Sequence, residues 1–236
     1  MTAPALADLA GQRVLVVGGG SGIGLATAQR AAAQGARVTI AGRDAAKLAA
    51  AVATLGEDAA IASFDMTDAG QVESFFAGAP AFGHVVVTAA ALHSGPVRDL
   101  PLDKARAAFD SKFWGPYIVA RFARIAGQGS LTLVSGAAAR RPRAGRGAVA
   151  AASAAIEALT RVLAAELAPV RVNCVSPGLV DTPMLRAARA AIAPPPGLAT
   201  GRVGRPEEIA FQILACAANP YMTGVIVDVD GGLSLI

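Results

Sequence analysis

Short apolar segments alternate along the chain with longer segments in which hydrophobic residues recur at helical spacing. The apolar segments have the length of β-strands and read RVLVVG, ARVTIAG, AAIASFD, GHVVVTAA, SLTLVSG, VRVNCVSPG and GVIVDVDGG. Strands that are apolar throughout suit a parallel sheet that helices cover on both faces. Because crossovers between parallel strands are right-handed, the pattern predicts an α/β fold with a doubly wound parallel sheet.

The length and composition are consistent with this fold. The 236 residues contain no linker-like segment, so we expect a single domain over 1–236. No apolar run approaches the length needed to span a bilayer, and the N-terminus lacks the basic start of a signal peptide, so we expect a cytoplasmic protein without a membrane partner. Cys174 and Cys216 lie in apolar segments and are expected to be free buried thiols, and we expect no metal site.

Positive charge is concentrated in one segment. The chain has a net charge of +4, and the segment RRPRAGR contains Arg140, Arg141, Arg143 and Arg146. No aromatic residues are interleaved there and no nucleic-acid-binding signature accompanies it, so we expect no nucleic-acid partner. Two interpretations stay open, a solvated loop or a loop that binds an anionic small-molecule substrate such as a carboxylate, phosphate or enolate.

A glycine-rich segment follows the first predicted strand and opens the first predicted helix. In VVGGGSGIGLA, the spacing of Gly18, Gly22 and Gly24 lets the backbone turn tightly and approach a pyrophosphate. The helix N-terminus would add free N–H groups and the positive end of its dipole. The alternative is a plain tight turn.

The end of the second predicted strand bears on the choice of dinucleotide. An NAD site commonly has an acidic residue there that binds the ribose hydroxyls, whereas this chain has Gly42 followed by Arg43. A guanidinium pairs with a 2′-phosphate, so the segment IAGRD favours NADP(H) over NAD(H). The alternative is an ordinary surface arginine.

With these features together, the chain resembles the short-chain dehydrogenase/reductase family over nearly its whole length. The segments FDMTD, RVNCVSPGLVDTPM, GRVGRPEEIA and TGVIVDVDGG match further family motifs in the right order. The resemblance implies a Rossmann-like domain with a seven-stranded parallel sheet, and a homotetramer or homodimer built through the helices at 103–126 and 147–167. It also implies a set of cofactor-binding residues: Gly18, Gly20, Ser21, Gly22, Ile23, Gly24, Arg43, Asp65, Met66, Ala89, Ala90, Pro177, Gly178, Val180 and Thr182.

The same resemblance shows where the chain departs from the family. Members commonly use Asn, Ser, Tyr and Lys, with the Tyr as general acid and the Lys lowering the Tyr pKa. Aligned through AAIEALTR, the Tyr and Lys positions hold Val149 and Ser153. The Asn position holds Lys112, and the Ser position holds Gly136, with Ser135 just before it. Since valine has no proton to donate, carbonyl reduction by the family mechanism is not expected.

Four residues are candidate replacements for the missing catalytic groups. Lys112 could return an ammonium to the site from the opposite helix, or it could be a lysine on a solvated or interface helix face. His93, on a loop after the fourth strand, could supply a proton, or it could be an ordinary surface histidine. Ser135 could bind a substrate oxygen, or it could simply be a serine that ends a strand. Ser153 is a candidate by its position alone, since a serine cannot replace an ammonium electrostatically. The segment 184–198 is expected to cover the cleft as a lid.

Two functions therefore stay open. The first is an NADPH-dependent reductase whose acceptor, a quinone, an enone or an imine, takes hydride without a strong acid. The second is a non-redox protein on the same scaffold, which binds nucleotide for structure or sensing or catalyses a cyclisation or isomerisation.

Overall fold

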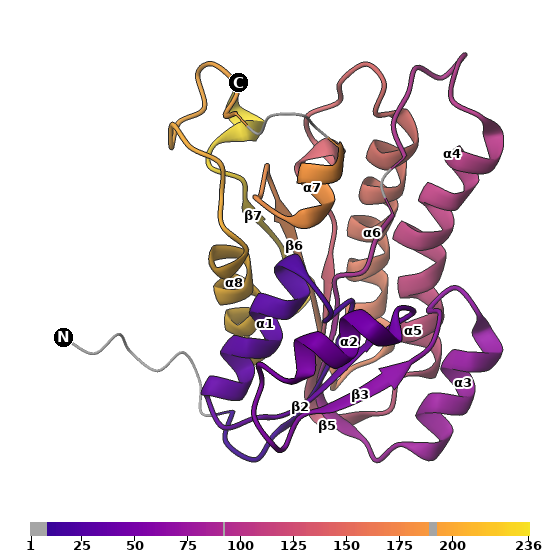
Figure 1. Cartoon of the computed structure of the whole chain (residues 1–236), viewed down its shortest axis with the longest axis vertical. Coiled ribbons are helices and arrows are strands. Elements are labelled where there is room, and N and C mark those ends of the chain that lie inside the picture. Colours follow the sequence, from indigo (N-terminus) through magenta and orange to yellow (C-terminus); the bar gives the residue numbers. More distant parts are fainter. Residues whose placement is uncertain (1–8, 92, 189–192) are drawn as a thin grey trace.

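The computed structural model describes residues 9–91, 93–188 and 193–236. A twisted sheet of parallel strands runs through the middle of the molecule, with helices on both sides (Figure 1). The strand order is β3-β2-β1-β4-β5-β6-β7, and all the paired strands are parallel. The strands are β1 (Arg13–Val17), β2 (Arg37–Gly42), β3 (Ala60–Ser63), β4 (Phe82–Val87), β5 (Ile125–Val134), β6 (Arg171–Pro177) and β7 (Ile226–Val229). The prediction of a seven-stranded, doubly wound parallel sheet is confirmed.

The helices connect these strands and form the outer layers. They are α1 (Gly22–Ala33), α2 (Ala45–Val52), α3 (Ala69–Gly78), α4 (Leu102–Phe109), α5 (Gly115–Phe122), α6 (Gly147–Glu166), α7 (Pro183–Ala188) and α8 (Pro206–Ala218). A π-helical segment, η1 (Asp110–Trp114), joins α4 to α5, and short 3-10 helices are η2 (Ala137–Ala139) and η3 (Leu233–Leu235). The helical stretch expected around 103–126 is therefore interrupted by a wider turn that contains Lys112.

The central strands β1, β4 and β6 are buried on both faces of the sheet, which explains why they are continuously apolar. Along β1, Val14 and Val16 belong to the core beneath α1 and α8, whereas Leu15 and Val17 belong to the core beneath α3, α5 and α6. Successive strand residues point to opposite faces, so a strand buried on both sides needs hydrophobic residues at every position.

Helices α2 and α3 each begin with an aspartate cap. Asp44 accepts a hydrogen bond from the N–H of Lys47 at 3.0 Å and starts α2, and Asp68 accepts one from the N–H of Gln71 at 3.1 Å and starts α3. Each cap satisfies an N–H that the helix itself leaves unpaired. These caps end the loops after β2 and β3 at defined residues.

Helix α6 differs from our expectation that no apolar run approaches the length of a membrane span. An 18-residue window within this 20-residue helix has a mean hydropathy of 1.5, which by length and composition alone would let it cross a bilayer. In the structure it covers one face of the sheet, and Ile156 and Leu163 pack into the core there. The same face carries the buried acid Glu157, which is ion-paired.

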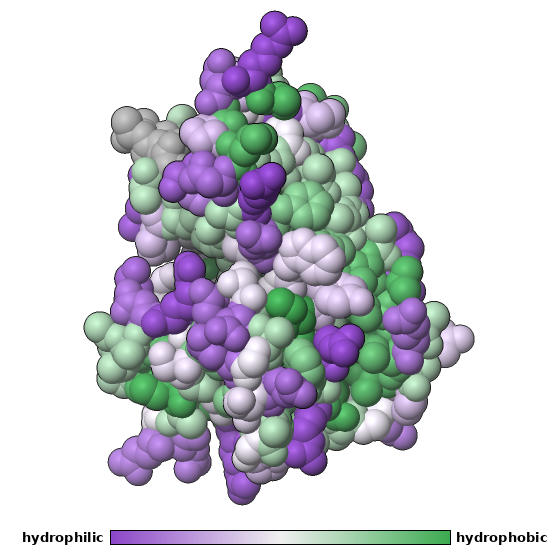
Figure 2. Space-filling view, turned by 90° about the vertical axis from the view of Figure 1, so that its right-hand side faces the viewer, coloured by the Kyte–Doolittle hydropathy of each residue, from purple (hydrophilic) through white to green (hydrophobic). Residues whose placement is uncertain are grey.

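The face formed around α4 and α5 carries hydrophobic residues interspersed with hydrophilic ones (Figure 2). On these helices and η1, Leu102, Trp114 and Tyr117 are exposed large hydrophobic residues. Trp114 and Tyr117 lie in the segment 103–126 that we expected to form subunit contacts, and the homotetramer or homodimer stays a prediction.

Candidate cofactor and substrate site

A cavity of about 500 Å³ opens at the carboxyl ends of the strands, where the order reverses between β1 and β4. Ligands of open α/β sheets bind at this switch point because the loops that follow neighbouring strands diverge there. The cavity is lined by the glycine loop, by the ends of β2 to β6, and by residues of η1, α6 and α7. All but one of the cofactor residues expected from the resemblance line it, and the exception is Gly20.

The glycine loop fits a dinucleotide because side chains would close it. Gly18 has a φ of +90°, and a Cβ there would lie 2.6 Å from the N of Ala89. A Cβ at Gly24 would lie 2.1 Å from the O of Gly18, so both glycines are needed for this turn. Ser21 precedes α1 without a side-chain cap, which leaves the first N–H groups of the helix available to an anion.

The segments that follow β2 and β3 bring two cations and two acids to the cavity. Arg43 is mostly exposed and lies 3.6 Å from the carboxylate of Asp65, measured from Nη1 to Oδ2. Lys47, which the sequence reasoning missed, also lines the cavity, and its Nζ lies 3.2 Å from Asp44. Hydrogen bonds from the backbone and side chain of Lys47 lower the pKa of Asp44, so its carboxylate is ionised and caps α2. The capping aspartate two residues after Gly42, with a lysine three residues beyond it, was the signal that could have located Lys47.

Lys112 lies in the π-helical turn, with its side chain directed inward. It is 8% exposed, and its Nζ donates hydrogen bonds to the carbonyl oxygens of Val134 at 3.2 Å and Ser135 at 2.5 Å. Burial lowers the pKa of Lys112 to about 8, although the nearby Cys174 and Glu157 act in the opposite direction. An ammonium has three N–H donors, so one donor remains beyond the two that bind β5. The lysine lines the cavity and is not a solvated surface residue.

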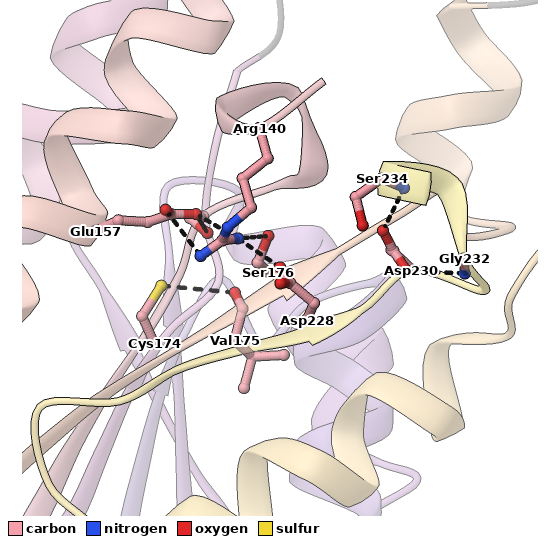
Figure 3. Close-up of polar contacts among 10 residues, drawn as sticks. Arg140, Glu157, Cys174, Val175, Ser176, Asp228, Asp230, Gly232 and Ser234 are labelled. Carbon is pink, nitrogen blue, oxygen red and sulfur yellow. Dashed lines mark hydrogen bonds and ion pairs between the residues drawn. The ribbon is translucent and has the colours of Figure 1, made fainter. Parts of the chain in front are cut away.

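A cluster of hydrogen bonds and ion pairs around Glu157 and Arg140 lies beside the carboxyl end of β5 (Figure 3). The hydroxyl of Ser135 donates a hydrogen bond to Glu157 Oε1 at 2.9 Å, and Arg140 Nη2 lies 3.1 Å from Glu157 Oε2. The guanidinium of Arg140 reaches between Glu157 on α6 and Asp228 on β7, and it also donates to Ser176 Oγ at 3.3 Å. Sequence reasoning gave no role to Glu157, although a lone acid within an alanine-rich apolar helix was a signal for a buried partner.

The arginines at 140–146 separate into two groups. Arg140 is used by this ion-pair cluster and is absent from the cavity lining, whereas Arg141, Arg143 and Arg146 line the cavity. The segment therefore directs Arg140 to the ion-pair cluster and contributes its other three arginines to the cavity lining.

Val149 and Ser153 lie one turn apart on α6, and both line the cavity. Val149 is 6% exposed, and Ser153 is fully buried with no hydrogen-bond partner for its Oγ among the described residues. This part of the cavity wall therefore consists of the methyl groups of Val149 and the hydroxyl of Ser153. Neither residue offers an acid of tuned pKa to a substrate.

The remaining predicted residues are placed as follows. His93 is half-buried and lies outside the residues that line this cavity, so the structure does not bring it together with Lys112 and Ser135. Both cysteines are free and buried. Among residues 9–91, 93–188 and 193–236, no three His, Cys, Asp or Glu side chains are grouped to hold a metal ion.

The segment expected to act as a lid starts at the cavity rim. Pro183, Met184 and Leu185 of α7 line the cavity, and Arg186 forms a two-bond ion pair with Asp181 just before the helix. Residues 189–192 of that segment lie outside the described residues, so the lid stays a prediction.

Comparisons with known proteins agree with this architecture. A family model described as enoyl-(acyl carrier protein) reductase matches residues 17–234. The chain is 31% identical to the short-chain dehydrogenase/reductase malC of Malbranchea aurantiaca, with 96% of each chain covered. It is similar to the solved structure of MalC from the same organism, described as a reductase/Diels-Alderase, with a TM-score of 0.84 and 97% of each chain covered.

A second solved structure carries a bound cofactor. It is a small-chain dehydrogenase in complex with NADPH, 35% identical, with a TM-score of 0.79, and the match covers 96% of this chain and 100% of that one. The family model, the relatives and the seven-stranded sheet all agree, and they show that the chain belongs to the short-chain dehydrogenase/reductase family, whose members bind nicotinamide cofactors.

Proposed function

We propose that this protein is an NADPH-dependent reductase of an activated acceptor, a quinone, an enone or an imine. One observation carries the proposal: a complete dinucleotide cradle opens into a cavity whose α6 wall presents Val149 and Ser153. Such a cavity is equipped for hydride transfer but has no tyrosine acid at that wall. The acceptor must therefore be one that takes hydride without strong acid assistance.

The residues of the cradle fit NADP(H). The glycine loop and the N-terminus of α1 would hold the pyrophosphate, since a Cβ at Gly18 or Gly24 would clash with backbone atoms across the turn. Arg43 and Lys47 would hold the 2′-phosphate, and the residues from Pro177 to Thr182 would line the nicotinamide end. When bound, NADPH supplies the hydride. The similar small-chain dehydrogenase in complex with NADPH supports this choice of cofactor.

We assign two roles to Lys112: it donates a proton to the acceptor, and its ammonium stabilises the negative charge that develops on the acceptor. Its ammonium is fixed by the carbonyl oxygens of Val134 and Ser135, and its pKa of about 8 suits proton donation near neutral pH. An enone, a quinone or a neutral imine gains a proton together with the hydride, and Lys112 or water would supply it. An iminium gains hydride alone, so for it Lys112 has no proton to give.

The first experiment measures cofactor binding and turnover separately. NADPH and NADH are titrated while nicotinamide fluorescence is followed, and the NADPH complex is then mixed with quinones, enones and preformed imines. We expect micromolar binding of NADPH, weaker binding of NADH, and loss of nicotinamide absorbance with at least one acceptor class. Absence of NADPH binding at micromolar concentration would overturn the proposal.

A second candidate is a non-redox reaction in the same cavity, such as a cyclisation. The observation that favours it is the similarity to MalC, which is described as both a reductase and a Diels-Alderase. A cycloaddition needs a shaped apolar cavity that orders two reacting groups and no proton donor. NADPH binding without turnover of any acceptor, together with accelerated cyclisation of an unsaturated substrate, would favour this candidate.

A further inference from the structure

The loop that joins β5 to α6 presents positive charge to the cavity. Arg141, Arg143 and Arg146 come from this loop and line the cavity beside Val149 and Ser153. We infer that this end of the cavity binds an oxyanion of the substrate, a carboxylate or a phosphate, with Arg141 as its principal contact. The inference rests on the proposed function in one respect only, namely that the substrate occupies the β5–α6 end of the cavity.

The unpaired polar atoms of the described residues point to the same end. Six buried side-chain nitrogen or oxygen atoms have no hydrogen-bond partner, and two of the six belong to residues that line the cavity. These two are Nη1 of Arg141 and Oγ of Ser153, and Ser153 is fully buried. Buried donors in folded proteins are nearly always paired, and a guanidinium forms its strongest hydrogen bonds with carboxylate or phosphate oxygens.

The acids near the loop do not compete for Arg141. Glu157 and Asp228 are both bound by Arg140, the neighbour that turns away from the cavity. Sequence alone cannot distinguish the two adjacent arginines, but the structure gives one of them two carboxylates and leaves the other with an unpaired buried nitrogen. Arg140 thus neutralises the local acids, and Arg141 keeps its charge for the cavity.

The charges along the cavity are also unevenly distributed. Among the described lining residues, the carboxylates are Asp44 and Asp65, which follow β2 and β3. Strands β1 and β4 separate these acids from β5, so the lining residues at the β5–α6 end carry positive charge without a carboxylate. Low-dielectric walls with one sign of charge raise the local concentration of the opposite ion.

The cofactor does not account for this positive end. Its pyrophosphate belongs at the glycine loop after β1, and its 2′-phosphate belongs at Arg43 and Lys47 after β2. A solvated loop does account for Arg143, which is exposed, but it does not account for Arg141, whose Nη1 is shielded from solvent. A substrate oxyanion satisfies this nitrogen directly.

The test uses three benzylideneacetone probes that differ in one group at the para position: a carboxylate, a phosphonate and a neutral carboxamide. Their binding to the full chain is measured by calorimetry without cofactor and with saturating NADP⁺, which cannot reduce the probes, and turnover with NADPH is measured separately. The variants are Arg141→Gln, Arg141→Lys, and the control Arg98→Gln. Arg98 is an exposed arginine outside the cavity lining, and its replacement removes the same charge.

We expect at least one acid probe to bind more tightly than the carboxamide. Arg141→Gln should weaken that binding by roughly 10- to 100-fold and change carboxamide binding little, because only the charge-assisted hydrogen bonds are lost. Arg141→Lys should give an intermediate loss because a lysine keeps the charge without the fork of donors. Arg98→Gln should bind like the unchanged protein, and high salt should weaken the acid probes selectively.

Equal binding of all three probes, or unchanged acid binding in Arg141→Gln, would overturn the inference. Since binding is measured without turnover, a protein that reduces the carboxamide as well as the acids would retain the proposed function and lose this inference. A protein that binds the acid probes through Arg141 but never oxidises NADPH would retain this inference and lose the proposed function. Retained carboxamide binding in each variant shows that the cavity is intact.

Discussion

The ammonium of Lys112 donates a hydrogen bond to the main-chain carbonyl oxygen of Ser135. This contact joins the π-helical turn between α4 and α5 to the carboxyl end of β5. Residues of this turn and of α6 line the same cavity. It places a buried cation in the cavity where Val149 and Ser153 offer neither an acid of tuned pKa nor a charge. The first prediction concerns this lysine.

We expect Lys112→Met to lower kcat/KM for an enone acceptor by roughly 10²- to 10⁴-fold, the usual contribution of a positioned acid. Reduction of a preformed iminium should fall far less, because that reaction takes no proton. The measurement is the steady-state rate with each acceptor at saturating NADPH. Lys104→Met is the control, since Lys104 is an exposed lysine on the neighbouring helix. Equal losses with both acceptors would contradict a role in proton supply.

The same lysine predicts a pH dependence. Its pKa is lowered from 10.5 to about 8 by burial, so enone reduction should decline as the pH rises through about 8. Stability should change in the opposite direction. Between pH 8 and 10.5 the unfolded chain binds the proton that the folded chain has released, so the free energy of unfolding contributed by this group rises with pH. Burial raises the pKa of Cys174 to about 11 and also raises the pKa of Cys216, so these thiols oppose the rise in every variant. Urea unfolding should therefore show a difference in unfolding free energy between Lys104→Met and Lys112→Met that grows in favour of Lys104→Met as the pH rises.

The glycine loop offers a matched pair of substitutions. Gly18→Ala requires a φ of +90° and brings a Cβ to 2.6 Å from the N of Ala89, so we expect a stability loss of about 1–3 kcal/mol and loss of NADPH binding. Gly20→Ala meets its nearest atom, Leu48 Cδ2, at 3.7 Å, which is ordinary contact. Thermal unfolding and fluorescence titration of both variants check this. Equal behaviour of the two variants would show that the steric argument is wrong.

Cofactor selectivity is predicted to depend on Arg43. Arg43→Gln should weaken NADPH binding by about 10-fold and leave NADH binding nearly unchanged, because only NADPH carries a 2′-phosphate for the guanidinium. The control is Arg37→Gln, which removes an exposed arginine from the opposite end of β2. The measurement is the ratio of the two dissociation constants by nicotinamide fluorescence. A ratio that stays constant in Arg43→Gln would exclude Arg43 from phosphate recognition.

The ion-pair cluster around Glu157 should contribute mainly to stability. Glu157→Gln removes the carboxylate that binds Ser135 and Arg140, and we expect a loss of about 2 kcal/mol, reduced from fully buried pairs because Arg140 is partly exposed. Urea unfolding measures it, with Glu166→Gln as the control because Glu166 is exposed at the end of the same helix. NADPH binding should change little in both variants. An unfolding free energy equal to that of the control would contradict the assignment.

The sequence by itself determined the fold and the dinucleotide cradle. Continuous apolar strands must be buried on both faces, which predicts a parallel sheet between helix layers. The spacing of Gly18, Gly22 and Gly24 predicts the turn because only glycine fits it, and the structure places these residues at the switch point. The loss of the tyrosine is likewise read from the chain, since Val149 has no hydroxyl wherever it lies.

Only the tertiary structure decided which polar residues face the cavity. Arg140 and Arg141 are adjacent and chemically identical, yet contacts with Glu157 and Asp228 engage one of them, while the other lines the cavity. Lys112 turns inward because a π-helical turn interrupts its helix, and His93 lies away from the cavity lining. The orientation of each of these side chains depends on contacts between residues that are distant in sequence. The local sequence pattern does not reveal those contacts.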